Sequence, residues 1–288
     1  MENQKLYKSD QGKASILAMY DAKLASLNLA YESRIVETSF GETHLLVCGQ
    51  SENPPLFLLH GSNGNAPIAL ETYPDLFEKY QVFAIDVLAQ PNKSAENRLS
   101  MKDLSYGAWI HELINILDLD HLTLAGFSFG GLIILKALLF SGQKIKHAFL
   151  AAPAFIVNGN PLVALFKVFI PMKKYMRTQN KNQVKAFLKA LFTSPDAFAV
   201  DFLSEVFLHF NMDFSPIPVI TSTEAAGIKT PITLFAADQD IIFPGKKMIT
   251  RAKKIFPSLH ATYLLEKSKH VQNQQDNDFI QALILQEA

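Results

Sequence analysis

The sequence predicts an α/β protein with a mostly parallel central sheet, helices on both faces and one helical insertion. Three observations support this fold class. Short runs that are apolar on both faces recur from residue 55 onward, as strands of a covered parallel sheet require. Helical stretches lie between these runs, so that strands and helices alternate along the chain. The alternation stops once, between Pro153 and Pro231, in a segment far too long for an ordinary connection.

The first part of the chain predicts a helix and a hairpin ahead of the parallel strands. Apolar residues recur at helical spacing across residues 9–29. Strand-like runs at residues 34–37 and 43–48 flank a short segment that contains Gly41, and a glycine suits a hairpin turn. We therefore expect an amphipathic leading helix, followed by an antiparallel edge of the sheet.

The remaining elements of the core follow from the alternation. Strands are expected at residues 56–59, 82–85, 122–125, 148–152, 232–236 and 261–265. Helices are expected at residues 70–78, 101–117, 130–140, 245–256 and 276–285. Residues 1–152 and 225–288 are therefore predicted to form one core domain.

Residues 153–224 are predicted to form a helical lid, inserted after the fourth of these apolar strands. Helices are expected at residues 162–170, 184–192 and 197–210, punctuated by prolines such as Pro171. The many Phe, Leu and Val side chains of residues 155–214 can pack the lid on the core or line an apolar pocket. The size of the substrate does not follow from them.

Composition excludes several classes of protein. The chain has 288 residues, 49% of them hydrophobic, which predicts a packed globular protein rather than a disordered one. A net charge of zero, without a dense basic block, disfavours nucleic-acid binding. The single cysteine, Cys48, cannot form an internal disulfide, and the first ten residues lack the apolar stretch of an export signal. We expect a cytoplasmic protein, a monomer or homodimer, without an integral membrane span.

The strongest functional motif surrounds Ser128. The sequence A-G-F-S-F-G-G directly follows the predicted strand 122–125 and directly precedes a predicted helix. It fits the G-x-S-x-G nucleophile elbow, in which a serine occupies a sharp strand-to-helix turn. A side chain at Gly126 or Gly130 would crowd the neighbouring strand and helix. Ser128 is therefore the candidate nucleophile, and a glycine-rich packing turn is the alternative interpretation.

A second loop can supply hydrogen-bond donors to a developing negative charge. The sequence H-G-S-N-G begins at His60, immediately after the predicted strand 56–59. Hydrolysis of a carbonyl compound places negative charge on an oxygen, which two fixed N–H donors can stabilise. We expect the backbone amides of Ser62 and Phe129 to be these donors, and His60 and Gly61 to support the loop. An ordinary Asn/Gly turn is the alternative.

Two aspartates follow the predicted strand 232–236 and are candidates for a carboxylate that orients a histidine. A carboxylate just past a strand end can accept the imidazole N–H and hold the ring in the productive tautomer. Asp240 precedes an apolar stretch and Pro244, whereas Asp238 lies nearer the strand. We favour Asp240, and Asp238 remains the alternative because many aspartates at such positions only form turns.

His270 is the candidate general base. Of eight histidines, it is the one that follows the last predicted strand, on the carboxyl side of both Ser128 and Asp240. The order nucleophile, acid, base along the chain is that of the α/β-hydrolase template. The alternative interpretation is a solvated histidine in a polar loop.

These motifs, together with the strand rhythm, resemble the α/β-hydrolase superfamily from about residue 34 to the end of the chain. Residues 36–44, 54–61 and 84–94 are similar to stretches of small soluble bacterial carboxylesterases. The resemblance implies an α/β-hydrolase fold and a Ser-His-Asp triad that cleaves carboxylic esters. Serine at position 128 excludes the relatives that need an aspartate nucleophile, namely the haloalkane dehalogenases and epoxide hydrolases.

The sequence departs from this family at three loop positions and leaves the reaction partly open. Ala89 and Pro91 stand where many relatives have glycines, and Lys269 stands where glycine is common. The same triad could cleave a thioester, an amide or a carbon–carbon bond, and a slow ligand-binding protein on this scaffold is a further alternative. We expect a small-molecule ester substrate, and no metal or organic cofactor is implied.

Overall fold

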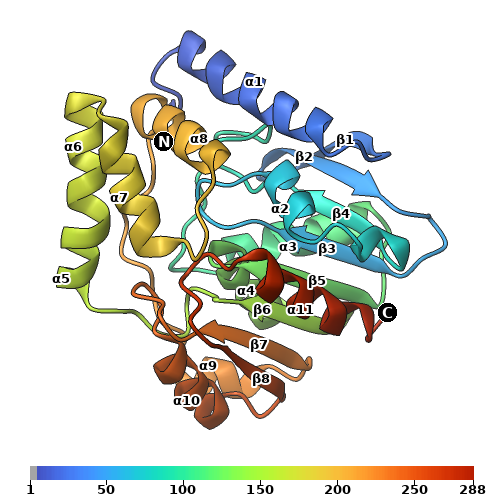
Figure 1. Cartoon of the computed structure of the whole chain (residues 1–288). Coiled ribbons are helices and arrows are strands. Elements are labelled where there is room, and N and C mark those ends of the chain that lie inside the picture. The colour runs from blue at the N-terminus through green and yellow to red at the C-terminus, as the bar shows by residue number, and fades with distance from the viewer. Residues whose placement is uncertain (1–4) are drawn as a thin grey trace.

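A mixed eight-stranded sheet forms the centre of the computed structural model, which describes residues 5–288 (Figure 1). Its strands lie in the order β1-β2-β4-β3-β5-β6-β7-β8. The strand bounds are β1 Glu32–Thr38, β2 Gly41–Cys48, β3 Pro55–Leu59, β4 Gln81–Ile85, β5 Leu122–Phe127, β6 Ile145–Ala151, β7 Ile232–Ala237 and β8 Leu259–Leu265. The strands from β3 to β8 run parallel, and β2 joins β4 antiparallel.

The predicted antiparallel edge is confirmed. Strands β1 and β2 pair antiparallel through a tight turn that brings Thr38 opposite Gly41. Gly41 has φ +115°, a backbone conformation that favours glycine because a Cβ atom would strain it. The sequence signal and the geometry of the turn therefore agree.

Helices cover both faces of the sheet, as the alternation predicted. Their bounds are α1 Asp10–Ser26, α2 Ala66–Thr72, α3 Ser105–Ile116, α4 Phe129–Phe140, α9 Ser222–Gly227, α10 Gly245–Ile255 and α11 Gln274–Leu285. Side chains of α3, α4, α9 and α10 pack in one apolar core, together with Phe57 and Leu59 of β3. Side chains of α1, α2 and α11 pack in a second core, together with Leu56 and Leu58. Alternate residues of the same strand thus enter opposite cores.

The helix predicted at residues 70–78 is wrong in its bounds. Helix α2 begins earlier, because the Asn65 side chain caps it by accepting a hydrogen bond from the Ile68 amide. The helix ends at Thr72, and a separate 3₁₀ turn spans Leu76–Glu78. Pro74 lies between the two pieces and has no N–H group with which to continue an α-helix.

A helical insertion separates β6 from β7 and packs around its own apolar cluster. Its helices are α5 Pro161–Ala164, α6 Ile170–Thr178, α7 Lys181–Leu191 and α8 Ala197–His209, with a π-helical turn at Leu165–Phe169. Their buried face includes Tyr175, Leu188 and Phe207. The amino-terminal residues Leu6 and Tyr7 join this cluster. In Figure 1 α6 and α7 stand to the left of the sheet.

The structure differs from the predicted insertion at two places. The helix expected at residues 162–170 continues past Pro171 to residue 178, because the π-helical turn that ends at Phe169, two residues before Pro171, accommodates the missing N–H group. The predicted boundary at residue 224 falls inside α9, whose Ala225 packs in the first core. The division into core and lid stays a prediction.

None of the helices in residues 5–288 has the length and apolarity needed to cross a bilayer.

Acid is expected to weaken the fold through His147, a buried residue of β6. Its Nε2 lies 2.9 Å from Thr233 Oγ1 and its ring stacks on Phe149. Burial lowers the pKa of His147 to about 4 from an ordinary value of 6.5. The unfolded chain therefore binds a proton in this pH window while the folded chain does not, so the free energy of unfolding should fall as pH drops from about 6.5 to about 4.

Urea denaturation at neutral and mildly acidic pH checks this expectation. His147→Gln should lose part of the pH dependence of the unfolding free energy, whereas His121→Gln, a change at an exposed site, should keep all of it. Equal pH dependence in the wild type and His147→Gln would contradict the assignment.

Candidate active site

The candidate site lies between β3 and β5, where successive strands stop being added on one side of the sheet and begin to be added on the other. From β3 the chain continues to β4 on one side, whereas from β5 it continues to β6 and β7 on the other. Ligands of open α/β sheets bind at such a point, outside the carboxyl ends of the strands. The loop that starts at His60 follows β3, and Ser128 follows β5. Both predicted motifs therefore meet at this edge.

Ser128 occupies the sharp turn that the motif predicts. It has φ 53° and ψ −109°, an unfavourable conformation for a residue with a side chain. A Cβ atom at Gly126 would lie 2.6 Å from the Ile134 side chain, and one at Gly130 would clash with the Leu59 and His60 carbonyl groups. Only glycines at these two positions let β5, α4 and the neighbouring loop pack so closely.

The structure brings Ser128, His270 and Asp240 into one hydrogen-bonded chain. His270 Nε2 lies 2.9 Å from Ser128 Oγ, and His270 Nδ1 lies 2.7 Å from Asp240 Oδ2. All three residues are buried, with exposed fractions of 7%, 8% and 4% respectively. The ring of His270 packs against Phe127 and Phe243, which restrict its orientation. This geometry allows a proton to pass from the hydroxyl to the imidazole.

Asp240, rather than Asp238, contacts His270. Asp240 Oδ1 accepts hydrogen bonds from the amides of Ile242 and Phe243, at 2.7 and 3.0 Å, which leaves Oδ2 directed at the imidazole. Asp238 Oδ1 is buried, and in the described chain it has no hydrogen-bond partner. The carboxylate that the sequence favoured is therefore the one placed to orient the histidine.

The loop after β3 lies against the elbow and is held by His60. His60 Nδ1 lies 2.8 Å from the Gly61 carbonyl oxygen, and the Val87 amide donates to His60 Nε2 at 3.0 Å. These two bonds require the neutral Nδ1–H tautomer. Burial lowers the pKa of His60, which also favours the neutral form of the ring. His60 is thus built into the loop, and its position fits the supporting role expected from the sequence.

The amides of Ser62 and Phe129, predicted to be oxyanion donors, lie near Ser128 and, in the described chain, have no turn, loop or cap hydrogen bond of their own. A Cβ atom at Gly61 would lie 3.3 Å from Ser128 Cβ, so the loop passes directly beside Ser128. Among the turn, loop and cap hydrogen bonds of residues 5–288, none has the amide of Ser62 or Phe129 as its donor. Phe129 begins α4, where backbone N–H groups lack intrahelical partners.

Asp86, next to this loop, is a buried residue whose contacts were not expected from the sequence. Its Oδ1 accepts a hydrogen bond from the Ala66 amide at the start of α2, and its Oδ2 lies 2.8 Å from His44 Nδ1. Asp86 therefore joins β2, the end of β4 and α2, the helix that follows the loop after β3. Nearby Ala89 has φ 57°, the left-handed conformation that a glycine would adopt without strain.

The insertion holds the loop that carries His270, which was also not expected. Residue Val271 forms backbone hydrogen bonds in both directions with the end of α7: its amide donates to the Leu191 carbonyl, and its carbonyl accepts from the Thr193 amide. The Thr193 hydroxyl accepts from the Lys269 amide at 2.9 Å and donates to the Val271 carbonyl at 2.8 Å. Thr193 thus binds the residues on both sides of His270.

Removal of the Thr193 hydroxyl is expected to lower turnover without abolishing it. Thr193→Val loses two hydrogen bonds, each worth about 1 kcal/mol, so kcat should fall roughly three- to tenfold with little change in KM. Thr193→Ser should restore kcat. Thr178→Val is the matched control, because it removes an exposed hydroxyl that donates to the Lys174 carbonyl and accepts from the Asn180 amide. Steady-state kinetics that give wild-type kcat for Thr193→Val would contradict a positioning role.

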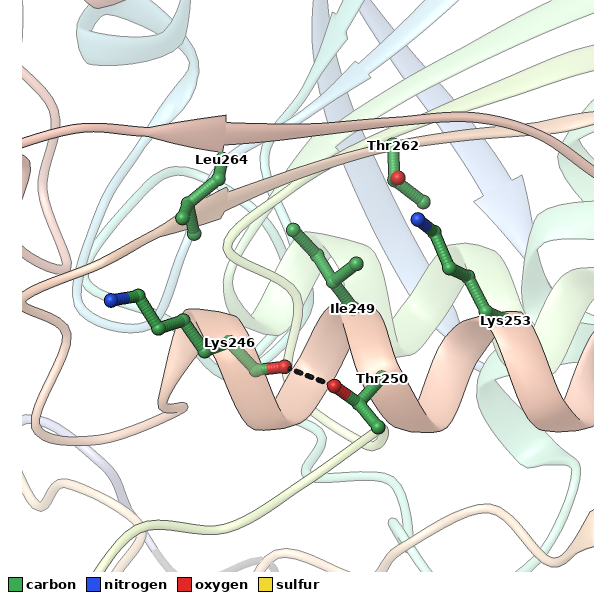
Figure 2. Close-up of a pocket in the computed structure, with 6 residues that line it drawn as sticks. All are labelled: Lys246, Ile249, Thr250, Lys253, Thr262 and Leu264. Carbon is green, nitrogen blue, oxygen red and sulfur yellow. Dashed lines mark hydrogen bonds between the residues drawn. The ribbon is translucent and has the colours of Figure 1, made fainter.

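A shallow groove elsewhere on the surface lacks the groups for this chemistry. Figure 2 shows that it lies between α10 and β8, with Ile249 and Leu264 inside it and Lys246 and Lys253 on its rim. Its only hydroxyls belong to threonines, and Thr250 donates its own to the Lys246 carbonyl. Across residues 5–288, no three His, Cys, Asp or Glu side chains are grouped to hold a metal ion.

Comparison with known proteins agrees with this architecture. A family model described as the alpha/beta hydrolase fold matches residues 54–187. The sequence is 23% identical over 282 residues to an uncharacterized carboxylesterase, nap, of Bacillus subtilis (strain 168), and the match covers 92% of this chain and 89% of that protein.

Solved structures are similar over almost the whole chain. Naproxen esterase (carboxylesterase NP) from Bacillus subtilis has a TM-score of 0.83 and 21% identity, with 97% of this chain and 98% of that one covered. Carboxylesterase CesB (YbfK) from Bacillus subtilis has a TM-score of 0.80 and 19% identity, with 96% and 97% covered. This chain therefore has the α/β-hydrolase fold and is similar to the bacterial carboxylesterases.

Proposed function

We propose that this protein is a serine hydrolase that cleaves carboxylic esters through an acyl-serine intermediate. The observation that carries the proposal is the hydrogen-bonded chain from Ser128 Oγ through His270 to Asp240. A serine in this arrangement is activated as a nucleophile, because the imidazole can take its proton as it attacks. The similarity to bacterial carboxylesterases supports an ester as the substrate.

In the proposed reaction, Ser128 Oγ attacks the ester carbonyl carbon while His270 Nε2 takes the hydroxyl proton. The resulting imidazolium is stabilised by Asp240, which accepts the Nδ1–H bond. The tetrahedral intermediate collapses, the bond to the alcohol oxygen breaks, and His270 donates the proton to that leaving oxygen. Water, deprotonated by His270, then attacks the acyl-serine, and the carboxylic acid leaves as Ser128 regains its proton.

The amides of Ser62 and Phe129 are proposed to bind the oxyanion of the tetrahedral intermediates. They are backbone donors held by β3 and α4, so they need no reorganisation when the charge develops. One such donor is typically worth roughly 3 to 4 kcal/mol of transition-state stabilisation. The amino-terminal end of α4, with its unpaired N–H groups, favours negative charge at the same place.

The insertion is proposed to act as a lid over an apolar part of the substrate. Ser128 is buried, and the end of α7 is hydrogen-bonded to the loop that carries His270. The apolar cluster of the insertion is built from aromatic and aliphatic side chains. A charged or sugar group placed against it would lose its hydration. A small to medium apolar acyl or alcohol group fits this environment.

A panel of p-nitrophenyl esters of increasing acyl length tests the apolar pocket. We expect kcat/KM to rise with each added methylene by up to about fourfold until the pocket is filled, since a buried methylene is worth about 0.8 kcal/mol. Thioesters of the same acyl groups, measured beside them, test the preferred leaving group. A strong preference for charged or sugar esters would contradict an apolar pocket.

A further inference from the structure

Four large apolar side chains of the insertion lie exposed beside one another, three on its outer helix and one on the segment after α8. Leu162 and Phe166 are 62% and 64% exposed, and Leu165 and Phe214 are 43% and 47% exposed. The spacing of the first three places them on one side of the helix formed by α5 and the following π-helical turn. Phe214 comes from the segment after α8, and its ring lies 5.7 Å from that of Phe169 in the same turn. We call these four residues the α5–α6 patch.

The patch belongs to the most basic part of a protein whose net charge is zero. Residues 121–195 contain no aspartate or glutamate. Within this stretch, the insertion carries seven exposed basic residues: Lys167, Lys173, Lys174, Arg177, Lys181, Lys185 and Lys189. Lys181 alone among these seven forms an ion pair in the described chain, with Asp201 of α8. Charge and exposed apolar surface are therefore concentrated on the same helices.

Cations directly border the apolar side chains. The Lys173 ammonium lies 5.6 Å from the centre of the Phe214 ring, and Lys167 is next to Phe166 in the chain. Lys8 lies close enough to Lys173 that burial and this neighbouring charge both lower the pKa of Lys8. An occupant of the patch must therefore offer apolar groups and negative charges within a few ångströms of each other.

We propose that the α5–α6 patch docks on an anionic lipid surface. Phospholipid headgroups would meet Lys167 and Lys173, while Phe166 and Leu162 enter the boundary between headgroups and acyl chains. A second copy of this chain is a poorer occupant. A two-fold contact through the patch would bring together two surfaces of the same positive charge, which repel each other. The proposal goes beyond ester hydrolysis and does not depend on it.

Vesicle flotation tests this docking. The full-length protein is mixed with vesicles of phosphatidylcholine plus phosphatidylserine, or of phosphatidylcholine alone, at low and at high salt. We expect binding to the anionic vesicles that weakens with salt, and much weaker binding to the neutral ones. Failure of the wild type to float with anionic vesicles at low salt would overturn the proposal.

Three double variants separate this patch from general basic attraction. Lys167→Glu with Lys173→Glu should weaken vesicle binding at least tenfold, since each lysine removed accounts for about fivefold. Leu162→Gln with Phe166→Gln should also weaken it about tenfold or more. Lys246→Glu with Lys253→Glu makes the same charge change on α10, at the groove in Figure 2, and should keep most of the binding. Thermal melts establish that each variant is folded.

Two results would contradict the assignment. Equal loss of binding in the α10 variant would show a nonspecific electrostatic attraction. Concentration-dependent dimerisation in sedimentation velocity, abolished by Leu162→Gln with Phe166→Gln, would instead assign the patch to a second copy of the chain.

Discussion

Ser128→Ala is expected to reduce ester hydrolysis to near the uncatalysed rate while leaving the protein folded. The nucleophile is lost, and removal of a triad nucleophile lowers kcat by about 10⁶-fold in well-characterised serine hydrolases. The missing hydroxyl makes one side-chain hydrogen bond, to His270, so the free energy of unfolding should change by only about 1 kcal/mol.

Turnover of a short p-nitrophenyl ester and a urea denaturation curve check the two halves of this prediction. Ser62→Ala is a suitable control, because the proposed oxyanion donor at that residue is the backbone amide and not the side chain. It should keep activity close to that of the wild type. Undiminished hydrolysis by Ser128→Ala would remove Ser128 from the mechanism.

Asp240→Asn is expected to lower kcat by about 10⁴-fold. Asparagine can still accept the Ile242 and Phe243 amides through its carbonyl oxygen, so the loop should keep its shape. The amide nitrogen would then face His270 and favour the imidazole tautomer with its proton on Nε2. In that tautomer the ring cannot accept the proton of Ser128.

Asp238→Asn provides the matched control for this prediction. It makes the same chemical change two residues away, on a carboxylate whose Oδ1 has no hydrogen-bond partner in the described residues. We expect a change in kcat of less than about tenfold, because the two ring nitrogens of His270 are bonded to Asp240 and Ser128 and not to this side chain. A large loss in Asp238→Asn together with normal activity in Asp240→Asn would reverse the assignment.

The sheet could be predicted from the sequence because its strands are buried on both faces. Each predicted core strand lies within three residues of the observed one at either end. The helix bounds could not be predicted where side-chain caps and prolines decide them. Asn65 caps the start of α2 at a point where the sequence does not yet show the apolar spacing of a helix. The chain remains helical past Pro171 because a π-helical turn precedes this proline.

In the candidate site, too, some residues could be predicted from the sequence and others could not. Ser128, Asp240 and His270 could be named because each follows a strand end and their order along the chain is informative. Thr193 could not be named, since its hydroxyl meets the His270 loop across 76 positions of sequence without any local pattern. The buried Asp86 also lacked a signal, because its partners are a helix start and His44 of β2, a histidine 42 positions away in the sequence.

Labelling with a fluorophosphonate probe, followed by mass spectrometry of the labelled peptide, tests the central claim most directly. The probe forms a covalent bond with a serine only when the hydroxyl is activated by a neighbouring base. The account predicts rapid labelling of the wild type at Ser128, and at least a thousandfold slower labelling when His270 is replaced by alanine. Absence of labelling, or labelling at a different serine, would contradict it.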